Sequence, residues 1–462
     1  MRFEKTLQRL VKPYFYCMMR ALLFSLLCFV LFSCSKEKFI DSKAAFIITS
    51  DTALHFNTVF TSVGSITKQL KIFNINNQKL RISNMQLMGG DASFFKMNVS
   101  GTPGTQFSDV DIEKGDSLYI FVSVNINPDS QLLPFLIKDS IRIDFNGNTQ
   151  FVKLDAYGQN AHFLRSAIIQ QNTIWTANLP YVLLDTFAVS AGATLTIEKG
   201  TQIYCNANTP FIVAGSLQVN GAADSTGRVT FRSNRLDLPY SAQPGSWRGI
   251  YFNENSVNNT LRNVTIENAL QGIGLKGSTV VLDGCIINNC AEAGITAFNS
   301  KVLATNCLVS NCSNNVVLDV ANDYTFINCT IAAYSNQYLY HQNAAVTIQD
   351  AGAVFQNCII YGEMETVTDE VDYQNSNGTT FNVHFENTLY KSATQNPLVL
   401  YSNCLQNVDP QFMTTDSENG IFNFHITASS PCIDAGKKNN LLLDLDGKPR
   451  NEVPDIGCFE FH

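Results

Sequence analysis

The chain has 462 residues, which is enough for roughly two to four domains with sizeable cores. Charged residues make up 15% of the chain, well below the roughly 25% usual for soluble domains, and this composition favours a β-rich protein with polar turns. Residues 160–462 carry 14 Lys and Arg against 26 Asp and Glu. Because a face for nucleic acid is normally basic, this acidic part argues against a nucleic-acid partner.

Residues 1–33 have the pattern of a secretory signal peptide. A basic stretch, KPYFYCMMR, precedes an apolar run over residues 21–32 and then Ser33, which is the order found in signal peptides. Because the run is shorter than the about 20 apolar residues of a membrane-spanning helix, it favours a cleaved signal peptide. An uncleaved anchor helix is the alternative. A start at Met18 or Met19 would shorten the long leader.

The end of this segment, LFSC, resembles the lipobox of bacterial lipoproteins, with Phe32 bulkier than the usual residue at that place. The resemblance implies that Cys34 is lipidated and becomes the first residue of the mature chain. It further implies an exported protein held by lipid on a membrane of the cell envelope, most simply the outer membrane of a Gram-negative bacterium. Residues 34–43 would be a polar tether.

Residues 44–160 predict an immunoglobulin-like β-sandwich. Short β-prone runs alternate with polar breaks, and in SIRIDF the residues Ile141, Ile143 and Phe145 share one face. Roughly six to eight strands at this spacing are typical of such a sandwich. The stretches TSVGSITKQLKIFNIN and ISNMQLMGGDASFF resemble the immunoglobulin-like modules of abnormal-spindle and hydin-type proteins, which implies a spacer or binding module.

Residues 161–406 predict a parallel β-helix, because one pattern repeats at a nearly constant interval. Val264, Cys285, Cys307 and Cys329 are almost evenly spaced along the chain, and a second column follows at 294–295, 316–317 and 338–339. Two short strands per repeat with Gly and Asn turns indicate a solenoid with one repeat per coil. The predicted fold is therefore all-β, with a sandwich followed by a helix of about ten coils.

The repeated cysteines allow three interpretations. In each repeat the cysteine and the residue two positions on share a face, so the thiols are predicted to stack as small apolar groups in the helix bore. Disulfides between coils fit poorly, because parallel side chains about 4.8 Å apart exceed the roughly 3.8 Å that a bridge prefers. A metal site would need ligands converging on one point, not a rising line.

Further stretches resemble known β-helix proteins. GATLTIEKGTQIYC, IVAGSLQVNG and GSWRGIYF resemble coils of bacterial right-handed, pectate-lyase-like parallel β-helices, and FNFHITASSPCIDAG and PDIGCFEF resemble the closing segment of secreted members. The resemblance implies a right-handed helix capped by residues 407–462, with Trp247 in a packing role. Cys432 and Cys458 replace two alanines of the usual closing segment, which implies a disulfide there. The turn at Asp444 and Asp446 is a weaker candidate for calcium.

Register neighbours in the repeat give the candidates for chemistry. Asp319 and His341 stand one period apart and form a weak candidate acid–base pair, with an ordinary hydrogen-bonded pair as the alternative. Lys301 and Asp323 are a second such pair, predicted to be a surface ion pair.

Beyond His341 the coil spacing widens, since the intervals from Cys329 to Cys358 and from Cys358 to Thr388 are longer than the earlier ones. The extra length predicts loops on one side of the helix, the usual place for binding features. The loop EMETVTDEVDYQN offers hard oxygen ligands for calcium, a rim for a neutral glycan, or simply a solvated turn. Its carboxylates are Glu363, Glu365, Asp369, Glu370 and Asp372.

These patterns predict a lipid-anchored surface protein whose β-helix binds a glycan or another macromolecule without catalysis. A lyase of the pectate type uses a strong base, commonly Arg or Lys, yet residues 263–449 contain no arginine, and their acidity repels acidic polysaccharides. The alternative is a carbohydrate-active enzyme, either a polysaccharide lyase or a glycoside hydrolase, acting on a neutral or calcium-bridged glycan. A scaffold role in the envelope is the third interpretation. No cofactor is expected unless the acidic loop binds calcium.

Overall fold

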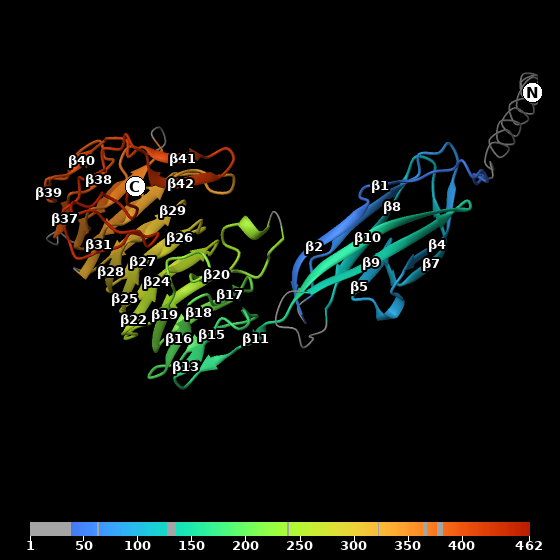
Figure 1. Ribbon diagram of the computed structural model, residues 1–462, viewed down its shortest axis with the longest axis horizontal. Helices are drawn as coiled ribbons and strands as arrows, with labels where there is room; N and C mark the ends of the chain where they lie inside the picture. The colour runs from blue at the N-terminus through green and yellow to red at the C-terminus, as the bar shows by residue number, and fades with distance from the viewer. Residues whose placement is uncertain are drawn as a thin grey trace, which may run out of the picture. The chain divides into compact units, whose positions relative to one another are not determined.

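The computed structural model describes residues 38–61, 64–126, 135–237, 240–321, 323–363, 367–376 and 382–462. The chain divides into two compact units, the first within residues 1–156 and the second mainly residues 157–462 (Figure 1). The predicted signal peptide and Cys34 lie outside the described residues. Within those ranges, no helix has both the length and the apolar character needed to cross a membrane.

The first unit is built from two five-stranded sheets. Alternate residues of each strand are buried, as in the predicted SIRIDF stretch, where Ile141 and Ile143 are fully buried and Phe145 nearly so. The two sheets meet in a shared core, and the ring centroids of Phe56 and Phe95 lie 5.8 Å apart across it. One sheet has the order β1(Ile48–Thr49), β3(Lys68–Phe73), β8(Ser117–Val124), β5(Phe95–Val99), β6(Thr102–Gly104), and the other β2(Ala53–Phe60), β10(Asn148–Gln159), β9(Phe135–Phe145), β4(Leu80–Leu87), β7(Gln106–Ile112).

The second unit is a parallel β-helix with three sheets, which we call helix sheets 1, 2 and 3. Coils 1 to 9 each contribute one strand to each sheet in turn, and coil 10 contributes strands to helix sheets 1 and 3. Neighbouring strands of a sheet pair in parallel, one coil apart (Figure 1). Coils 1 to 10 begin with the first ten strands of helix sheet 1, which confirms the predicted number.

The strands of helix sheet 1 are β11(His162–Leu164), β14(Tyr181–Leu183), β17(Gln202–Cys205), β20(Val229–Ser233), β23(Val264–Glu267), β26(Ile286–Asn288), β29(Leu308–Ser310), β32(Thr330–Ala333), β35(Ile359–Gly362), β38(Leu389–Tyr390) and β40(Leu405–Gln406). Helix sheet 2 consists of β12(Ile168–Ile169), β15(Phe187–Val189), β18(Pro210–Val213), β21(Gly249–Phe252), β24(Gln271–Lys276), β27(Ala293–Phe298), β30(Val316–Asp319), β33(Val346–Gln349) and β36(Val371–Gln374). Helix sheet 3 consists of β13(Thr173–Trp175), β16(Thr194–Glu198), β19(Ser216–Asn220), β22(Asn259–Arg262), β25(Thr279–Asp283), β28(Lys301–Thr305), β31(Asp323–Ile327), β34(Ala353–Gln356), β37(Val383–Glu386) and β39(Leu400–Ser402).

The bore is filled by stacked apolar side chains, and the cysteine column is part of it. Cys285, Cys307, Cys329 and Cys358 are each at most 1% exposed, belong to one core cluster and carry free thiols. The pairing of Ile286 with Leu308 and of Leu308 with Thr330 sets these cysteines in register, one per coil. The prediction of a packing column is confirmed.

Asparagines in the left-handed region turn the chain from helix sheet 3 into helix sheet 1. Asparagine tolerates this backbone conformation because its short side chain bonds locally. Such residues occupy six of these turns, with φ between 46° and 54°: Asn263, Asn306, Asn328, Asn357, Asn387 and Asn403.

The C-terminal segment, residues 407–462, lies along the outer face of helix sheet 1. It starts with the hairpin β41(Phe412–Asp416)–β42(Ile421–Ile426), whose Phe424 packs against Leu308 and Ala332 in one cluster. The turn asparagines bind the rest: Asn306 donates to the carbonyl of Leu443 and Asn387 to that of Ala435, both at 3.0 Å. These contacts place the segment's apolar side chains against the flank of several coils.

The predicted disulfide between Cys432 and Cys458 is absent. Both thiols are free and fully buried, and they belong to different apolar clusters of the segment. Backbone hydrogen bonds hold each in place, from Ile456 to the Cys432 carbonyl and from Leu445 to the Cys458 carbonyl. The two thiols therefore act as apolar packing groups, slightly larger than the alanines of the related pattern.

Candidate functional site

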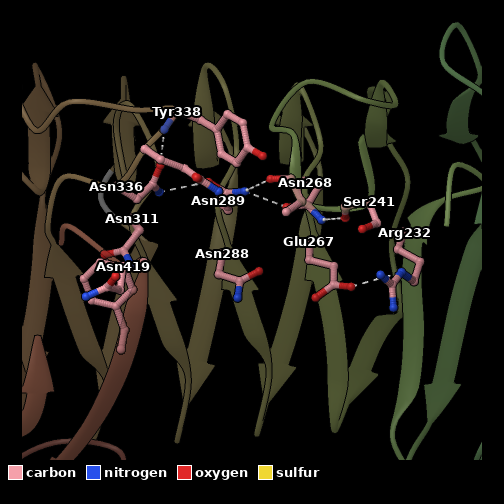
Figure 2. Close-up of a pocket in the computed structure, with 14 residues that line it drawn as sticks. Arg232, Ser241, Glu267, Asn268, Asn288, Asn289, Asn311, Asn336, Tyr338 and Asn419 are labelled. Carbon is pink, nitrogen blue, oxygen red and sulfur yellow. Dashed lines mark hydrogen bonds and ion pairs between the residues drawn. The ribbon is translucent and has the colours of Figure 1, made fainter. Parts of the chain in front are cut away.

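A polar groove of about 370 Å³ lies on the outer face of helix sheet 1, over coils 4 to 8. Its floor is formed by strand residues of that sheet, and its rim by the corners that lead into helix sheet 2 (Figure 2). The turn of the β41–β42 hairpin, at Asn419 and Gly420, forms the opposite wall.

The floor is a row of polar side chains, one from each coil. Strand pairing places Arg232 of β20 beside Glu267 of β23, Glu267 beside Asn288 of β26, and Asn288 beside Ser310 of β29. These are outward positions, because their chain neighbours Phe231, Ile266, Ile287 and Val309 fill the bore. A molecule lying parallel to the helix axis would meet one polar group about every 4.8 Å.

One end of the floor is charged but electrically balanced. Arg232 Nε lies 3.1 Å from a carboxylate oxygen of Glu267, and both side chains remain partly exposed to the groove. Among the described residues this is the only ion pair of the groove lining. Tyr204 is the register neighbour of Arg232 on the preceding coil, and burial raises the pKa of its phenol.

Among the described residues that line the groove, Asn288 has an incomplete set of hydrogen bonds. Its amide oxygen is buried, yet no group in the described parts of the chain donates a hydrogen bond to it. Figure 2 shows the Asn288 side chain on the floor beside Glu267, on the side toward Asn311, with Asn289 of the rim above it. A buried acceptor without a partner costs about 1–3 kcal/mol, so a position that keeps one calls for an explanation.

The rim is a ladder of asparagine amides on successive coils. Asn268, Asn289 and Asn311 follow the strands of coils 5 to 7, and all three adopt positive φ. The Asn289 amide donates to the Asn268 side-chain oxygen at 2.6 Å, and the Asn336 amide donates to that of Asn289 at 3.1 Å (Figure 2). These bonds hold the amide planes in fixed orientations.

Long corner loops close the two ends of the groove. In coils 5 to 7 the strand of helix sheet 1 is followed closely by that of helix sheet 2. Longer loops follow the strand in coil 4, with described residues 234–237 and 240–248, and in coil 8, with residues 334–345. Ser241 and Ala242 of the first loop accept amide hydrogen bonds from Asn268 and Asn289. Asn336 and Tyr338 of the second face the groove from the other end.

A second pocket of about 290 Å³ lies further along the same face, between coils 8 and 9 and the C-terminal segment. Tyr334, Tyr361, Glu363 and Asp409 are among its lining residues. Burial is the main cause that raises the pKa of Tyr361 to about 12, with nearby carboxylates adding to it. Glu363 is fixed by the hydroxyl groups of two serines, at 3.1 Å each.

The structure does not bring Asp319 and His341 together, so that predicted pairing is wrong. Asp319 is the register neighbour of Gln349, because residues 334–345 leave the coil before β33 begins. The expected column at residues 338–339 is occupied instead by Val346 and Thr347. His341 is buried and hydrogen-bonds Glu370 at 3.1 Å.

The predicted pair of Lys301 and Asp323 is confirmed. The two residues are register neighbours on β28 and β31, and Lys301 Nζ lies 3.7 Å from a carboxylate oxygen of Asp323. Both side chains are exposed, so the pair is a surface ion pair and contributes little to stability.

In the described part of the acidic loop, no three His, Cys, Asp or Glu side chains gather at one point. Glu370 is buried beside His341, Asp369 accepts bonds from Ser392 and Ala393, and Asp372 accepts one from Gln374. Glu363 turns to the second pocket. Glu365 lies outside the described residues.

Sequence reasoning missed the groove floor, although the repeat held the signal. Aligning coils 5 to 7 stacks the doublets Glu267–Asn268, Asn288–Asn289 and Ser310–Asn311, each following an apolar residue that points inward. The predicted packing role of Trp247 is confirmed, since it is fully buried and donates its indole hydrogen to the Glu267 carbonyl at 2.9 Å.

Comparisons with known proteins agree with this fold. A family model described as a right-handed beta helix region matches residues 165–331 and, in an overlapping match, residues 215–389. The second unit is therefore a right-handed parallel β-helix. A search of curated proteins found no match.

Solved structures give only distant similarities. The catalytic domain of a family 87 α-1,3-glucanase in complex with tetrasaccharides shares 10% identity over 80% of this chain and 89% of that chain, with a TM-score of 0.19. A family 123 glycoside hydrolase from Clostridium perfringens and a PapD-like domain of human CEP192 each share 10% identity over 28% of this chain, with TM-scores of 0.18. The matches span 31% of the hydrolase and 92% of the human domain.

Proposed function

We propose that this protein binds a neutral glycan in the groove on helix sheet 1 and does not cleave it. The observation that carries the proposal is the buried Asn288 oxygen, which lacks a donor at the centre of a floor lined by polar groups. A ligand hydroxyl would supply the missing hydrogen bond and remove its cost. A sugar offers many hydroxyls, each able to donate and accept.

The charges of the groove favour a neutral ligand. Arg232 and Glu267 cancel each other, and they still offer charge-assisted hydrogen bonds to hydroxyl groups. The excess of carboxylates over residues 160–462 would repel a polyanion. Binding of this kind should depend little on salt.

The shape of the groove favours a linear chain lying along the helix axis. The floor residues Arg232, Glu267 and Asn288 repeat once per coil, so a chain with regularly spaced hydroxyls meets them in succession. The two long corner loops limit the length that fits.

Hydrolysis is the second candidate function, and it belongs to the other pocket. A glycosidase needs two carboxyl groups about 5–9 Å apart. Of the described residues that line the groove, Glu267 is the one carboxylate, and it is paired. Glu363 and Asp409 line the second pocket together, which is the feature that favours an enzyme.

We further propose that the chain is exported and lipid-anchored through Cys34, in the cell envelope of a Gram-negative bacterium. The support is the apolar run over residues 21–32 followed by Ser33 and Cys34. The first unit would hold the β-helix away from the membrane. The proposal requires no cofactor.

A glycan-array screen of the purified protein tests the proposed function. We expect binding to linear neutral oligosaccharides and not to uronate-rich ones, with affinity that is insensitive to salt. The bound glycan is then incubated with the protein and the products are separated by chromatography. Shortened products would favour the enzyme, and failure to bind any neutral glycan would contradict the proposal.

A further inference from the structure

The wall loop, residues 334–345, forms one end of the groove but is held from two coils away. Its Asn336 donates to Asn289 of coil 6, and the Asn336 side-chain oxygen accepts bonds from the amides of Tyr338 and Leu339 at 2.8 and 2.9 Å. The part of the loop that faces the groove therefore has a defined conformation.

The second part of the wall loop, residues 341–345, is fixed by three buried ionisable side chains. His341 Nε2 lies 3.1 Å from Glu370 Oε2, and Lys391 Nζ lies 3.7 Å from Glu370 Oε1. The side chains of His341, Glu370 and Lys391 are 2%, 0% and 9% exposed. Glu370 Oε2 also accepts the backbone amide of Ala345 at 3.1 Å, so one carboxylate binds the loop at two points.

The first part of the wall loop, at Ser335, is held by residues of coils 9 and 10 as well. The Ser335 hydroxyl donates to Glu363, which follows β35 of coil 9, and it accepts the backbone amide of His341 at 3.1 Å. Lys391, which follows β38 of coil 10, donates to the Glu363 carbonyl. Coils 9 and 10 thus hold both halves of a loop that belongs to coil 8.

The cluster has no space to rearrange locally. A Cβ atom at Gly362 would lie 2.1 Å from Glu370 Oε1 and 2.4 Å from a ring carbon of His341. A buried carboxylate is costly unless its partners are in place, so loss of one partner should displace the loop and not merely weaken one contact.

We infer that His341, Glu370 and Lys391 are positioning residues for the ligand groove, acting through the wall loop without touching the ligand. The part that concerns the ligand rests on the proposed function. The part that concerns the loop does not, because loop order is measurable on the protein alone.

Hydrogen–deuterium exchange of the full chain tests the loop part, with Glu370→Gln as the variant. We expect amides of residues 335–341 to exchange at least tenfold faster, while amides of β26 and β29 keep their rates. The matched control is Glu386→Gln, which breaks a partly exposed pair with Lys437 at 2.7 Å and should leave residues 335–341 unchanged. Unchanged exchange in Glu370→Gln would overturn the inference.

A compensated variant separates positioning from general damage. Lys391→Met leaves the Glu370 charge buried without its lysine and should speed exchange, whereas Lys391→Met combined with Glu370→Gln removes both charges and should recover most of the protection. If Glu370→Gln fails to fold, the double variant still tests the inference. Loop amides that exchange as fast in the double variant as in Lys391→Met would contradict it.

The ligand arm uses the neutral oligosaccharide that binds best on the array. Glu370→Gln should lower its affinity at least fivefold, and the double variant should restore it. Faster loop exchange with unchanged affinity would overturn the role in ligand positioning. If no glycan binds the wild-type protein, the proposed function fails while the exchange result for the loop still stands.

Discussion

Single residues in this protein have different roles on the two sides of the same strands. Inward positions carry apolar groups, among them Cys307, and outward positions of coils 4 to 6 carry the polar floor. Asparagine supplies a third kind of position, where positive φ turns the chain and the amide bonds across coils. Asn288 departs from this pattern of satisfied groups, and such departures are expected at functional sites.

Cys307→Ala tests the packing role of the cysteine column. The variant should lose roughly 1–2 kcal/mol of unfolding free energy, because a small cavity replaces the buried sulfur. Urea unfolding with and without EDTA measures this. A urea midpoint that falls on adding EDTA, with zinc found in the protein, would contradict a packing role.

Thiol reactivity gives a second residue-scale prediction. Burial raises the pKa of Cys432 and Cys458 to about 12 and that of Cys307 well above its usual range, so few thiolates form at neutral pH. Cys404, whose pKa burial also raises, is half-buried and should be alkylated first among the described cysteines. Mass mapping should find Cys432 and Cys458 alkylated after denaturation without reductant. A peptide linking these two cysteines would show that the bridge exists.

At the scale of elements, the C-terminal segment is a lateral brace. Its Arg450 and Glu460 form a buried ion pair at 2.9 Å. Arg450 also donates a hydrogen bond at 2.8 Å to Asn306, one of the asparagines that turn the chain into helix sheet 1. The brace thereby ties several coils together.

Arg450→Met should detach the brace. Removal of one partner of a buried ion pair typically costs about 3–5 kcal/mol, because the other charge stays buried. Limited proteolysis should cut within residues 435–457 of this variant, and Arg450→Met with Glu460→Gln should resist better. Equal resistance of the wild type and the single variant would show that the pair does not hold the brace.

The elements also show how far the sequence alone could reach. The constant period of the repeat predicted the coils, because each coil must place the same residue type at the same register position, as at Cys285 and Cys307. The period gave a wrong prediction for residues 338–339, which match it by chance but lie in a corner loop. The course of the C-terminal segment depends on contacts with distant coils, such as Asn387 with Ala435, which carry no local pattern.

At the scale of the whole molecule, the chain joins a β-sandwich unit to a β-helix unit. The sequence predicted both, because strand alternation and the coil repeat are local properties. The groove was not predicted, since it combines side chains from coils 4 to 8 with a hairpin near the C-terminus.

The proposed lipid anchor belongs to this scale. Cys34→Ala should abolish labelling by a fatty-acid analogue in a bacterial host and leave an unprocessed precursor, because the thiol is the attachment atom. Cys28→Ala, inside the apolar run, is the matched control and should label normally. Undiminished labelling of Cys34→Ala would contradict the anchor.

The central claim is that Asn288 is kept for a ligand, and a paired measurement on Asn288→Ala tests it. We expect about a tenfold loss of affinity for the best neutral glycan in calorimetric titration, while the midpoint of urea unfolding stays equal or rises, because an unsatisfied buried oxygen is removed. Asn220→Ala, an exposed strand residue outside the groove, should change neither quantity. Affinity within twofold of the wild type would contradict the account.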